Sequence, residues 1–188
     1  MPDADWWQAL WPDPDGIVRS LGIEPGMMVV DVGCGSGYFT AAVARRAAPG
    51  RAIGVDIDPA MLAQARVSCR GLANCAWLSA DAMQLSHALA APADYVLIAN
   101  TFHGAPHKTA LSREVAAVLK RAGRFAIVNW HAQPRAETRV LDQPRGPPTE
   151  LRLSPEATRA AVEPAGFALE LLLELPPYHY AAIFRRAA

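Results

Sequence analysis

One stretch near the start of this sequence restricts the possible folds more than any other. An apolar run from Met27 to Val32, rich in β-branched residues, predicts a buried strand. Glycines then alternate at Gly33, Gly35 and Gly37, which predicts a sharp turn whose bare backbone admits a ligand closely. The next residues, 38–46, predict a helix. A strand, a glycine turn and a helix N-terminus together predict a site for the polar part of a nucleotide-like ligand.

The spacing of these glycines differs from the dinucleotide-binding fingerprint. That fingerprint needs its third glycine three positions after the second, where this chain has Tyr38. A nicotinamide-dependent dehydrogenase is therefore disfavoured. Two acids accompany the turn: Asp31 lies two residues before Gly33, and Asp56 ends the next apolar run, 19 residues beyond Gly37. An acid at the second position can accept hydrogen bonds from both hydroxyls of a ribose.

Strands and helices alternate along the rest of the chain. Apolar runs predict further strands over 52–55, 75–78, 95–99 and 125–128. Helices are predicted over 58–71, over 106–122 with Gly123 as the C-terminal cap, and from Ser154 to about 164–166. The runs 169–175 and 178–184 predict a terminal hairpin. This order predicts an α/β fold with a mostly parallel sheet, helices on both faces and an antiparallel edge.

The glycine turn, Asp31, Asp56 and the acid Asp81 after the third strand together resemble the class I S-adenosylmethionine (SAM)-dependent methyltransferases. The resemblance covers about residues 17–185, and the chain is most similar to the small type 11 group that includes ubiquinone and menaquinone biosynthesis C-methyltransferases. It implies a Rossmann-like seven-stranded methyltransferase sheet, mostly parallel, with a C-terminal antiparallel hairpin. It also implies SAM as the cofactor.

The cofactor site expected from the motif and the resemblance follows the carboxyl ends of the strands. Asp31 either orients the glycine turn or meets the amino group of the cofactor, and Asp56 takes the ribose hydroxyls. Cys34 lies within the turn, with its side chain expected to serve packing. The resemblance implies that Ile57 and Met83 pack beside the adenine, that Asp81 accepts its exocyclic amine and that Ala82 offers a backbone amide. The full set is Asp31, Gly33, Cys34, Gly35, Gly37, Asp56, Ile57, Asp81, Ala82, Met83 and Asn100.

The acceptor side is much less defined by the sequence. Methyl transfer from a sulfonium is an in-line displacement in which the protein mainly supplies alignment, and a base is needed only if the acceptor loses a proton. The candidate catalytic residues are His103, three residues past Asn100, and His131, after the fifth strand. A structural role is an equally good interpretation of His103, and for His131 a loop histidine bonded to backbone is the favoured interpretation. After the fourth strand the chain reads Asn-Thr-Phe-His, and not the Asn-Pro-Pro-Tyr of enzymes that methylate DNA adenine or glutamine.

The composition of the chain restricts the classes of molecule that it is expected to bind. The 18 basic and 18 acidic residues give a formal net charge of zero, and no basic stripe or nucleic-acid-binding module is visible, so a small-molecule acceptor is favoured over nucleic acid. The three cysteines fit no zinc spacing, and no metal site is expected. No apolar run approaches the ~18 residues needed for a membrane span, and no secretory leader is evident. We therefore expect a cytoplasmic enzyme.

The length of 188 residues predicts one methyltransferase domain over 17–188, preceded by an arm or lid over 1–16. No regular element can cross Pro12 and Pro14, yet this segment carries three tryptophans that require a packing surface. The arm and the loop predicted over 131–150 supply acceptor specificity, unless a second subunit does so in a homodimer. The alternative hypothesis is a catalytically inactive SAM-binding partner or regulatory protein.

Overall fold

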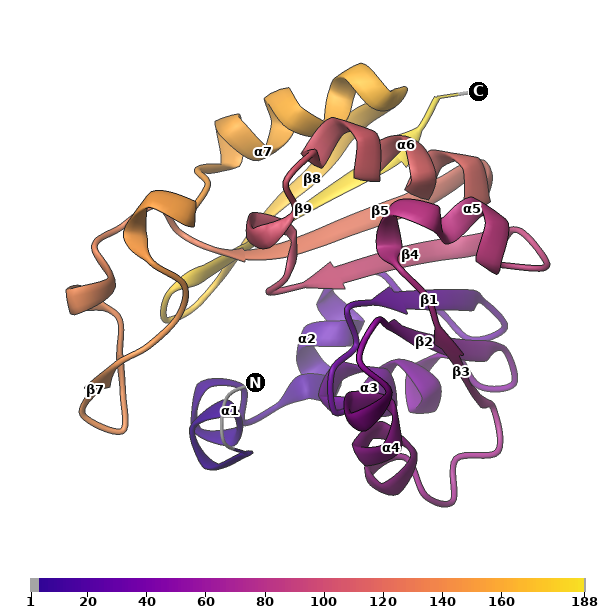
Figure 1. Ribbon diagram of the computed structural model, residues 1–188, viewed down its shortest axis with the longest axis horizontal. Coiled ribbons are helices and arrows are strands. Elements are labelled where there is room, and N and C mark those ends of the chain that lie inside the picture. The colour runs from indigo at the N-terminus through magenta and orange to yellow at the C-terminus, as the bar shows by residue number, and fades with distance from the viewer. Residues whose placement is uncertain (1–3, 188) are drawn as a thin grey trace.

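A computed structural model describes residues 4–187 of the chain, and its main feature is a twisted seven-stranded sheet (Figure 1). The strands lie in the order β3-β2-β1-β4-β5-β9-β8. β1 to β5 are mutually parallel, whereas β9 runs antiparallel to both of its neighbours. The bounds are β1 (Met28–Val32), β2 (Arg51–Asp56), β3 (Cys75–Ser79), β4 (Ala93–Ala99), β5 (Leu119–Trp130), β8 (Phe167–Leu175) and β9 (His179–Arg186). The predicted fold class is confirmed.

Helices cover both faces of this sheet, with α2, α3 and α4 on one side and α5, α6 and α7 on the other (Figure 1). The core is correspondingly divided in two, because successive residues of a strand point to opposite faces. Val29 of β1 belongs to the cluster that includes α3, and Val30 belongs to the cluster that includes α6. The helices are α1 (Ala4–Leu10), α2 (Pro14–Ser20), α3 (Tyr38–Ala47), α4 (Pro59–Ser68), α5 (Leu85–Ala88), α6 (Lys108–Val118) and α7 (Pro155–Val162).

The helix predicted over 106–122 is shorter than expected. α6 ends at Val118, and Leu119 already pairs with Ala93 as the first residue of β5. The register then shifts, so that Tyr95 pairs with Arg124 and the intervening residues of β5 bulge out of the ladder. Gly123 is therefore part of this irregular strand and does not cap the helix. Pairing with β4 satisfies the backbone groups that another helical turn would have satisfied.

The amino-terminal segment folds into two short helices separated near Pro12, so no regular element crosses Pro12 and Pro14, as predicted. Asp13 caps α2, because its carboxylate accepts a hydrogen bond of 2.8 Å from the Gly16 amide. Trp6 and Trp11 are buried in the same core cluster as α3. The first three residues of the predicted arm, and residue 188 of the predicted domain, lie outside the described part of the chain.

The segment predicted as a loop over 131–150 contains a small antiparallel hairpin of its own. Its strands are β6 (Arg139–Val140) and β7 (Gln143–Pro144), and short 3₁₀ turns lie at Arg135–Glu137 and Thr149–Leu151. β6 lies against α1. Two segments about 130 residues apart in the sequence therefore meet at one end of the sheet.

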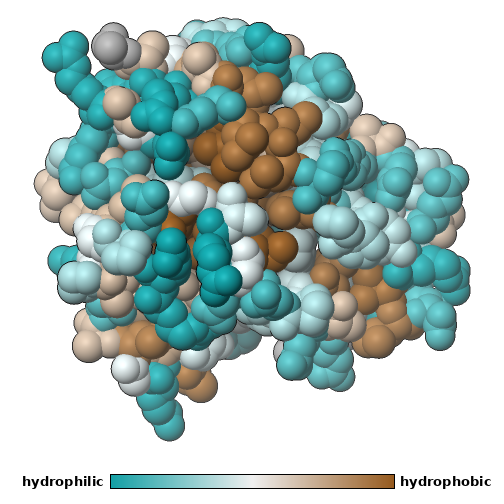
Figure 2. All heavy atoms as spheres, turned by 180° about the vertical axis from the view of Figure 1, so that it is seen from behind, coloured by the Kyte–Doolittle hydropathy of each residue, from teal (hydrophilic) through white to brown (hydrophobic). Residues whose placement is uncertain are grey.

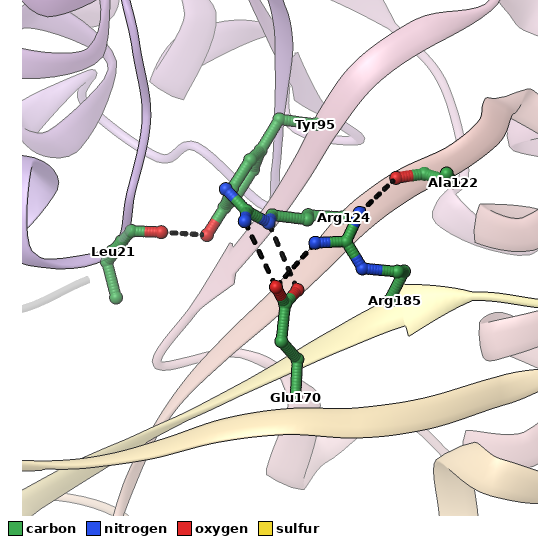
Figure 3. A network of polar contacts seen from close by, with 6 residues as sticks. All are labelled: Leu21, Tyr95, Ala122, Arg124, Glu170 and Arg185. Carbon is green, nitrogen blue, oxygen red and sulfur yellow. Dashed lines mark hydrogen bonds and ion pairs between the residues drawn. The ribbon is translucent and has the colours of Figure 1, made fainter.

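Polar contacts tie the outer strands to the centre of the molecule (Figure 3). The buried Tyr95 of β4 donates a hydrogen bond of 2.7 Å to the Leu21 carbonyl oxygen at the end of α2. On the same side, Glu170 of β8 accepts from Arg124 of β5 and from Arg185 of β9, with nitrogen–oxygen distances of 3.0 and 2.5 Å. The two ion pairs of Glu170 are partly exposed and contribute little to the free energy of folding. Among these contacts, the hydrogen bond of the buried Tyr95 therefore contributes most.

The opposite view shows apolar side chains gathered in one area and bordered by hydrophilic ones (Figure 2). Leu171 and Leu172 of the edge strand β8 are exposed, each by more than 40%.

No helix within residues 4–187 is long and apolar enough to cross a bilayer. The cytoplasmic location and the homodimer both stay predictions.

Candidate active site

A cavity of about 630 Å³ opens at the carboxyl ends of β1, β2 and β4. This position is the switch point of the sheet, because the helices that follow β1 and β4 pass to opposite faces. The residues that line it are Trp6, Trp7, Asp31, Gly33, Cys34, Gly35, Tyr38, Phe39, Asp56, Asp58, Met61, Ala99, Asn100, Thr101, His103, Trp130, Arg135, Arg145, Gly146 and Pro147. The structure thus brings together six of the expected cofactor residues and one of the two candidate histidines.

The glycine turn between β1 and α3 forms one wall of the cavity. The Gly33 and Cys34 amides donate to the Val55 carbonyl oxygen at 2.8 and 3.0 Å, which joins the turn to β2. Gly33 has a φ of +70°, and a Cβ atom there would lie 2.7 Å from Oγ1 of Thr101. Only glycine fits this position, because the Cβ of any other residue would clash with Thr101 and its backbone would be strained at this φ. Gly37, with a φ of +82°, ends the turn and starts α3 without itself lining the cavity.

Asp56 is held at the end of β2 by the backbone. One carboxylate oxygen accepts from the Gly35 amide at 2.8 Å, and the other accepts from the Asp58 amide at 3.0 Å. An ionised carboxylate offers about four acceptor sites, so about two stay available for hydroxyl groups in the cavity. Asp58 also lines the cavity, but its carboxylate caps α4 by accepting from the Ala60 amide at 2.8 Å.

Asp31 is almost completely buried, with 2% of its surface exposed. Burial raises the pKa of its carboxyl to about 6; the hydrogen bond of 2.6 Å from Thr40 opposes this shift and the negative charge of Asp56 adds to it. A cation bound beside Asp31 would favour the charged form and lower this pKa. Burial also raises the pKa of the neighbouring Cys34 thiol, and the two carboxylates raise it further, so this thiol stays protonated and unreactive.

Asn100 follows β4 with a φ of +60°, in the left-handed region that asparagine tolerates better than most residues. Its side-chain nitrogen and oxygen are both buried, and neither has a hydrogen-bond partner within the described residues. Buried polar groups without partners are rare in proteins and require an explanation. A ligand in the cavity that both donates and accepts hydrogen bonds would supply one.

The residues expected around an adenine lie at the same edge of the sheet but outside the cavity lining. The Ala80 amide donates to the Asp56 carbonyl oxygen at 3.2 Å, which places the turn after β3 beside the end of β2. Asp81 is exposed and caps its own turn by accepting from the Met83 amide at 2.9 Å. Ile57 is 68% exposed. Ala82 and Met83 are partly buried against the core cluster that includes α6.

The other end of the cavity is built from aromatic and basic side chains. Trp6 comes from α1, Trp130 ends β5, and Arg135 and Arg145 come from the segment between β5 and α7. Trp7 of α1 lies nearer the glycine turn, because its ring packs on Tyr38 and Phe39 at the start of α3, with centroid distances of 6.1 and 6.4 Å. Neither these arginines nor Trp130 was predicted from the sequence as a site residue. The only local signal was the length and composition of the predicted loop over 131–150.

The two candidate histidines have different surroundings. His103 lines the cavity, and its Nδ1 atom is buried without a partner in the described part of the chain. Burial lowers the pKa of His103, and the positive charges of Lys108 and Arg152 lower it further, so the ring is neutral at pH 7. His131 does not line the cavity; its Nε2 atom lies 2.8 Å from a carboxylate oxygen of Glu174. The structure thus separates His131 from the glycine turn.

Comparison with known proteins agrees with this geometry. Residues 29–123, from β1 into β5, match the family model of the methyltransferase domain. The chain belongs to this methyltransferase family. A SAM-dependent methyltransferase from Aquifex aeolicus has the same fold, with a TM-score of 0.81 over 97% of this chain and 93% of that one, at 23% identity. Magnesium protoporphyrin IX methyltransferase from Synechocystis PCC 6803, solved with bound SAM, superposes with a TM-score of 0.68 over 97% and 90%, at 19% identity.

Curated relatives match this methyltransferase over part of their length. A demethylmenaquinone methyltransferase from Tropheryma whipplei is 38% identical over 77 residues, which are 41% of this chain and 28% of the relative. A trans-aconitate 2-methyltransferase from Azoarcus is 29% identical over 131 residues, which are 70% of this chain and 50% of the relative. This methyltransferase therefore spans half or less of these relatives.

SAM is the cofactor of this class I methyltransferase, and the residues present fit it. The turn at Gly33 leaves the space that a side chain would fill, and Asn100 offers an unpaired donor and acceptor. Asp56 has acceptor capacity for a pair of hydroxyls. The buried carboxyl of Asp31 favours a cation beside it. The expectations of family, fold and cofactor are confirmed.

Proposed function

We propose that this methyltransferase moves the methyl group of SAM to a small-molecule acceptor by in-line displacement. The observation that carries the proposal is that one continuous cavity is lined both by the glycine turn with Asp56 and by the aromatic side chains Trp6 and Trp130. When bound, SAM supplies an activated methyl group on a sulfonium. The protein then has to align the acceptor and exclude water, and a cavity of this size is sufficient for a small molecule beside the cofactor.

We propose the following roles for the cofactor residues, those around the adenine being implied by the family resemblance. Asp56 accepts from the ribose hydroxyls, and Asp31 accepts from the amino group of the methionine part. The exposed Ile57 packs on the adenine, with Met83 beside it, and Asp81 accepts from the exocyclic amine. Gly33, Gly35 and Gly37 let the backbone approach the cofactor, Ala82 offers its amide, and Asn100 contacts the cofactor from the end of β4.

His103 is the candidate general base for an acceptor that must lose a proton. It lines the cavity and is neutral, so it can take up a proton at neutral pH. Once an acceptor is known, His103→Gln will lower kcat if a base is needed and will leave kcat unchanged if it is not. His131→Gln is the matched variant, and we expect unchanged turnover because His131 lies outside the cavity lining.

The first test of the function is a calorimetric titration with S-adenosylhomocysteine beside one with NAD. We expect binding of the first alone and its loss in Asp56→Ala. The matched control is Asp15→Ala, which removes an exposed carboxylate paired with Arg45 and leaves the cavity lining intact. Absence of S-adenosylhomocysteine binding would contradict the proposal. A screen of acceptors with methyl-labelled SAM then separates the enzyme from the alternative, an inactive SAM-binding protein, which would bind the cofactor and label nothing.

A further inference from the structure

Two arginines at the aromatic end of the cavity have no acidic partner. Arg135 and Arg145 both line the cavity, and neither forms an ion pair with a carboxylate of residues 4–187. The Nε atom of Arg145 is buried and has no hydrogen-bond partner among those residues. Arg145 is half-buried, and its Nε–H has given up water without a compensating hydrogen bond, which is costly unless a ligand completes it.

The segment that carries these arginines is held firmly. Arg152, with 6% of its surface exposed, donates through its guanidinium to four groups of the segment: the carbonyl oxygens of Gln133, Arg145 and Pro147 and the hydroxyl of Thr138. Arg135 donates to the carbonyl oxygens of Gly146 and Pro144 at 3.0 and 3.3 Å. These contacts use Nε and Nη2 of Arg135, so Nη1 and the second Nη2–H stay available to a ligand.

Aromatic rings surround the charged groups. The guanidinium carbon of Arg145 lies 5.4 Å from the centre of the Trp6 ring, in a cation–π contact. Arg152 lies 5.0 Å from the centre of the Trp130 ring. Arg145 therefore sits at an apolar wall, where the charge of a ligand is weakly screened, whereas Arg135 is exposed at the edge of the cavity.

Charges are segregated along the cavity. The carboxylates of Asp31, Asp56 and Asp58 lie at the end formed by the glycine turn, and the other end has only cationic and neutral lining residues. Arg135 and burial lower the pKa of Arg152, burial having the larger effect, and Arg152 in turn helps to lower the pKa of His103. The aromatic end of the cavity is thus electropositive.

We propose that Arg135 and Arg145 bind the carboxylate of an acidic acceptor whose apolar or aromatic body lies against Trp6, Trp7 and Trp130. This inference rests on the proposed methyl transfer and adds the class of acceptor. A guanidinium matches a carboxylate with paired, charge-assisted hydrogen bonds, and the tryptophans supply flat apolar surface for the body of the molecule. The competing occupant of the arginines is the carboxylate of the cofactor itself.

The test uses the full chain saturated with S-adenosylhomocysteine and matched pairs of probes. Benzoate, trans-cinnamate and indole-3-acetate are each titrated beside their carboxamides, with tryptophan fluorescence and calorimetry as readouts. We expect an acid to bind roughly 10- to 100-fold more tightly than its amide, as charged hydrogen bonds would give. Arg135→Gln and Arg145→Gln should lose this preference, and Arg145→Lys should keep part of it.

The control variant is Arg139→Gln, which removes an exposed arginine of the same segment outside the cavity lining. It should keep the preference for acids. Retained S-adenosylhomocysteine affinity shows that each variant is folded. The alternative that the arginines bind the carboxylate of the cofactor is tested with 5′-methylthioadenosine, which lacks the amino and carboxylate groups. If Arg145→Gln weakens S-adenosylhomocysteine but not 5′-methylthioadenosine, the arginine binds the cofactor and the proposal is overturned.

Two further results are decisive. If the wild-type chain binds S-adenosylhomocysteine but none of the acids, or binds acids and amides equally, the acceptor class is wrong while the proposed function stands. If it does not bind S-adenosylhomocysteine at all, both proposals fail together.

Discussion

Cofactor binding to this methyltransferase should release a proton from Asp31. In the ligand-free protein, burial raises the pKa of this carboxyl to about 6. The ammonium group of the cofactor, placed beside it as we propose, would favour the charged form and return the pKa toward its ordinary value. Affinity for S-adenosylhomocysteine therefore rises as the pH rises through about 6.

The size of the effect follows from that pKa. A carboxyl with a pKa of about 6 is ionised to roughly 10% at pH 5 and to roughly 90% at pH 7. If only the ionised form binds, affinity increases about ninefold over this range, which is about 1.3 kcal/mol. The same shift affects folding with the opposite sign. Because the folded pKa is raised, the stabilisation from protonated Asp31 is complete below pH 3.8 and is lost as the pH rises through about 6.

The assay is calorimetric titration with S-adenosylhomocysteine at several pH values between 5 and 8, each in two buffers of different ionisation enthalpy. The difference between buffers counts the protons released, and we expect close to one at pH 5 and close to none at pH 8. Asp31→Asn should remove both the pH dependence and the proton release, and the amide oxygen can still accept from Thr40. Proton release that persists in Asp31→Asn would refute this reasoning.

Three further predictions concern the fold that supports the site. Gly33→Ala should abolish S-adenosylhomocysteine binding, because its Cβ would lie 2.7 Å from Oγ1 of Thr101. The control is Gly26→Ala, also at positive φ but with no atom within 4 Å of the added Cβ. This control should keep the binding, and its free energy of unfolding in urea should fall by about 1 kcal/mol. Tyr95→Phe should lower the free energy of unfolding by about 1–3 kcal/mol in the same assay, because the buried Leu21 carbonyl oxygen loses its donor; an unchanged value would show that water replaces it. Ser154→Ala should lower the free energy of unfolding by about 1 kcal/mol, because the Ser154 hydroxyl caps α7 by accepting from the Ala157 amide at 3.1 Å. A decrease below about 0.3 kcal/mol, on the order of a surface substitution, would contradict the capping role.

The parts of the fold that could be predicted are those specified by neighbouring residues. Alternating glycines after a β-branched run define the turn at Gly33 wherever they occur, because few other residues tolerate its backbone angles. Asp58 followed by proline starts α4 by capping and by a fixed φ, both local effects. The acid at the end of β2 was predictable for a different reason, because its position relative to the turn follows from the regular pairing of two consecutive parallel strands.

The end of α6 could not be predicted, because it depends on a distant strand. Residues 119–122 continue the helical pattern of α6, and Gly123 is a good helix cap by its local sequence. Pairing of Leu119 with Ala93 takes precedence, since it extends a sheet that is already paired over most of β4. Here tertiary contacts outweigh local preference.

The acceptor end of the cavity depends on distant contacts to a still greater degree. Nothing near Arg135 or Arg145 in the sequence indicates that they face the glycine turn. They reach the cavity because β6 packs on α1 and because Arg152 gathers the segment through its hydrogen bonds. By contrast, the isolated histidines were visible in the sequence, but only the fold separates His103 from His131.

The cavity draws its two ends from different parts of the chain. Residues 31–61 supply the turn and the acids, whereas α1 and the segment 133–147 supply most of the opposite wall. That segment leaves from the end of β5 and returns at α7, both of which are anchored in the sheet independently of it. Because we propose that this segment binds the acceptor, we expect exchange of the residues between Gln133 and Arg152 to change the acceptor while leaving the cofactor residues of 31–61 in place.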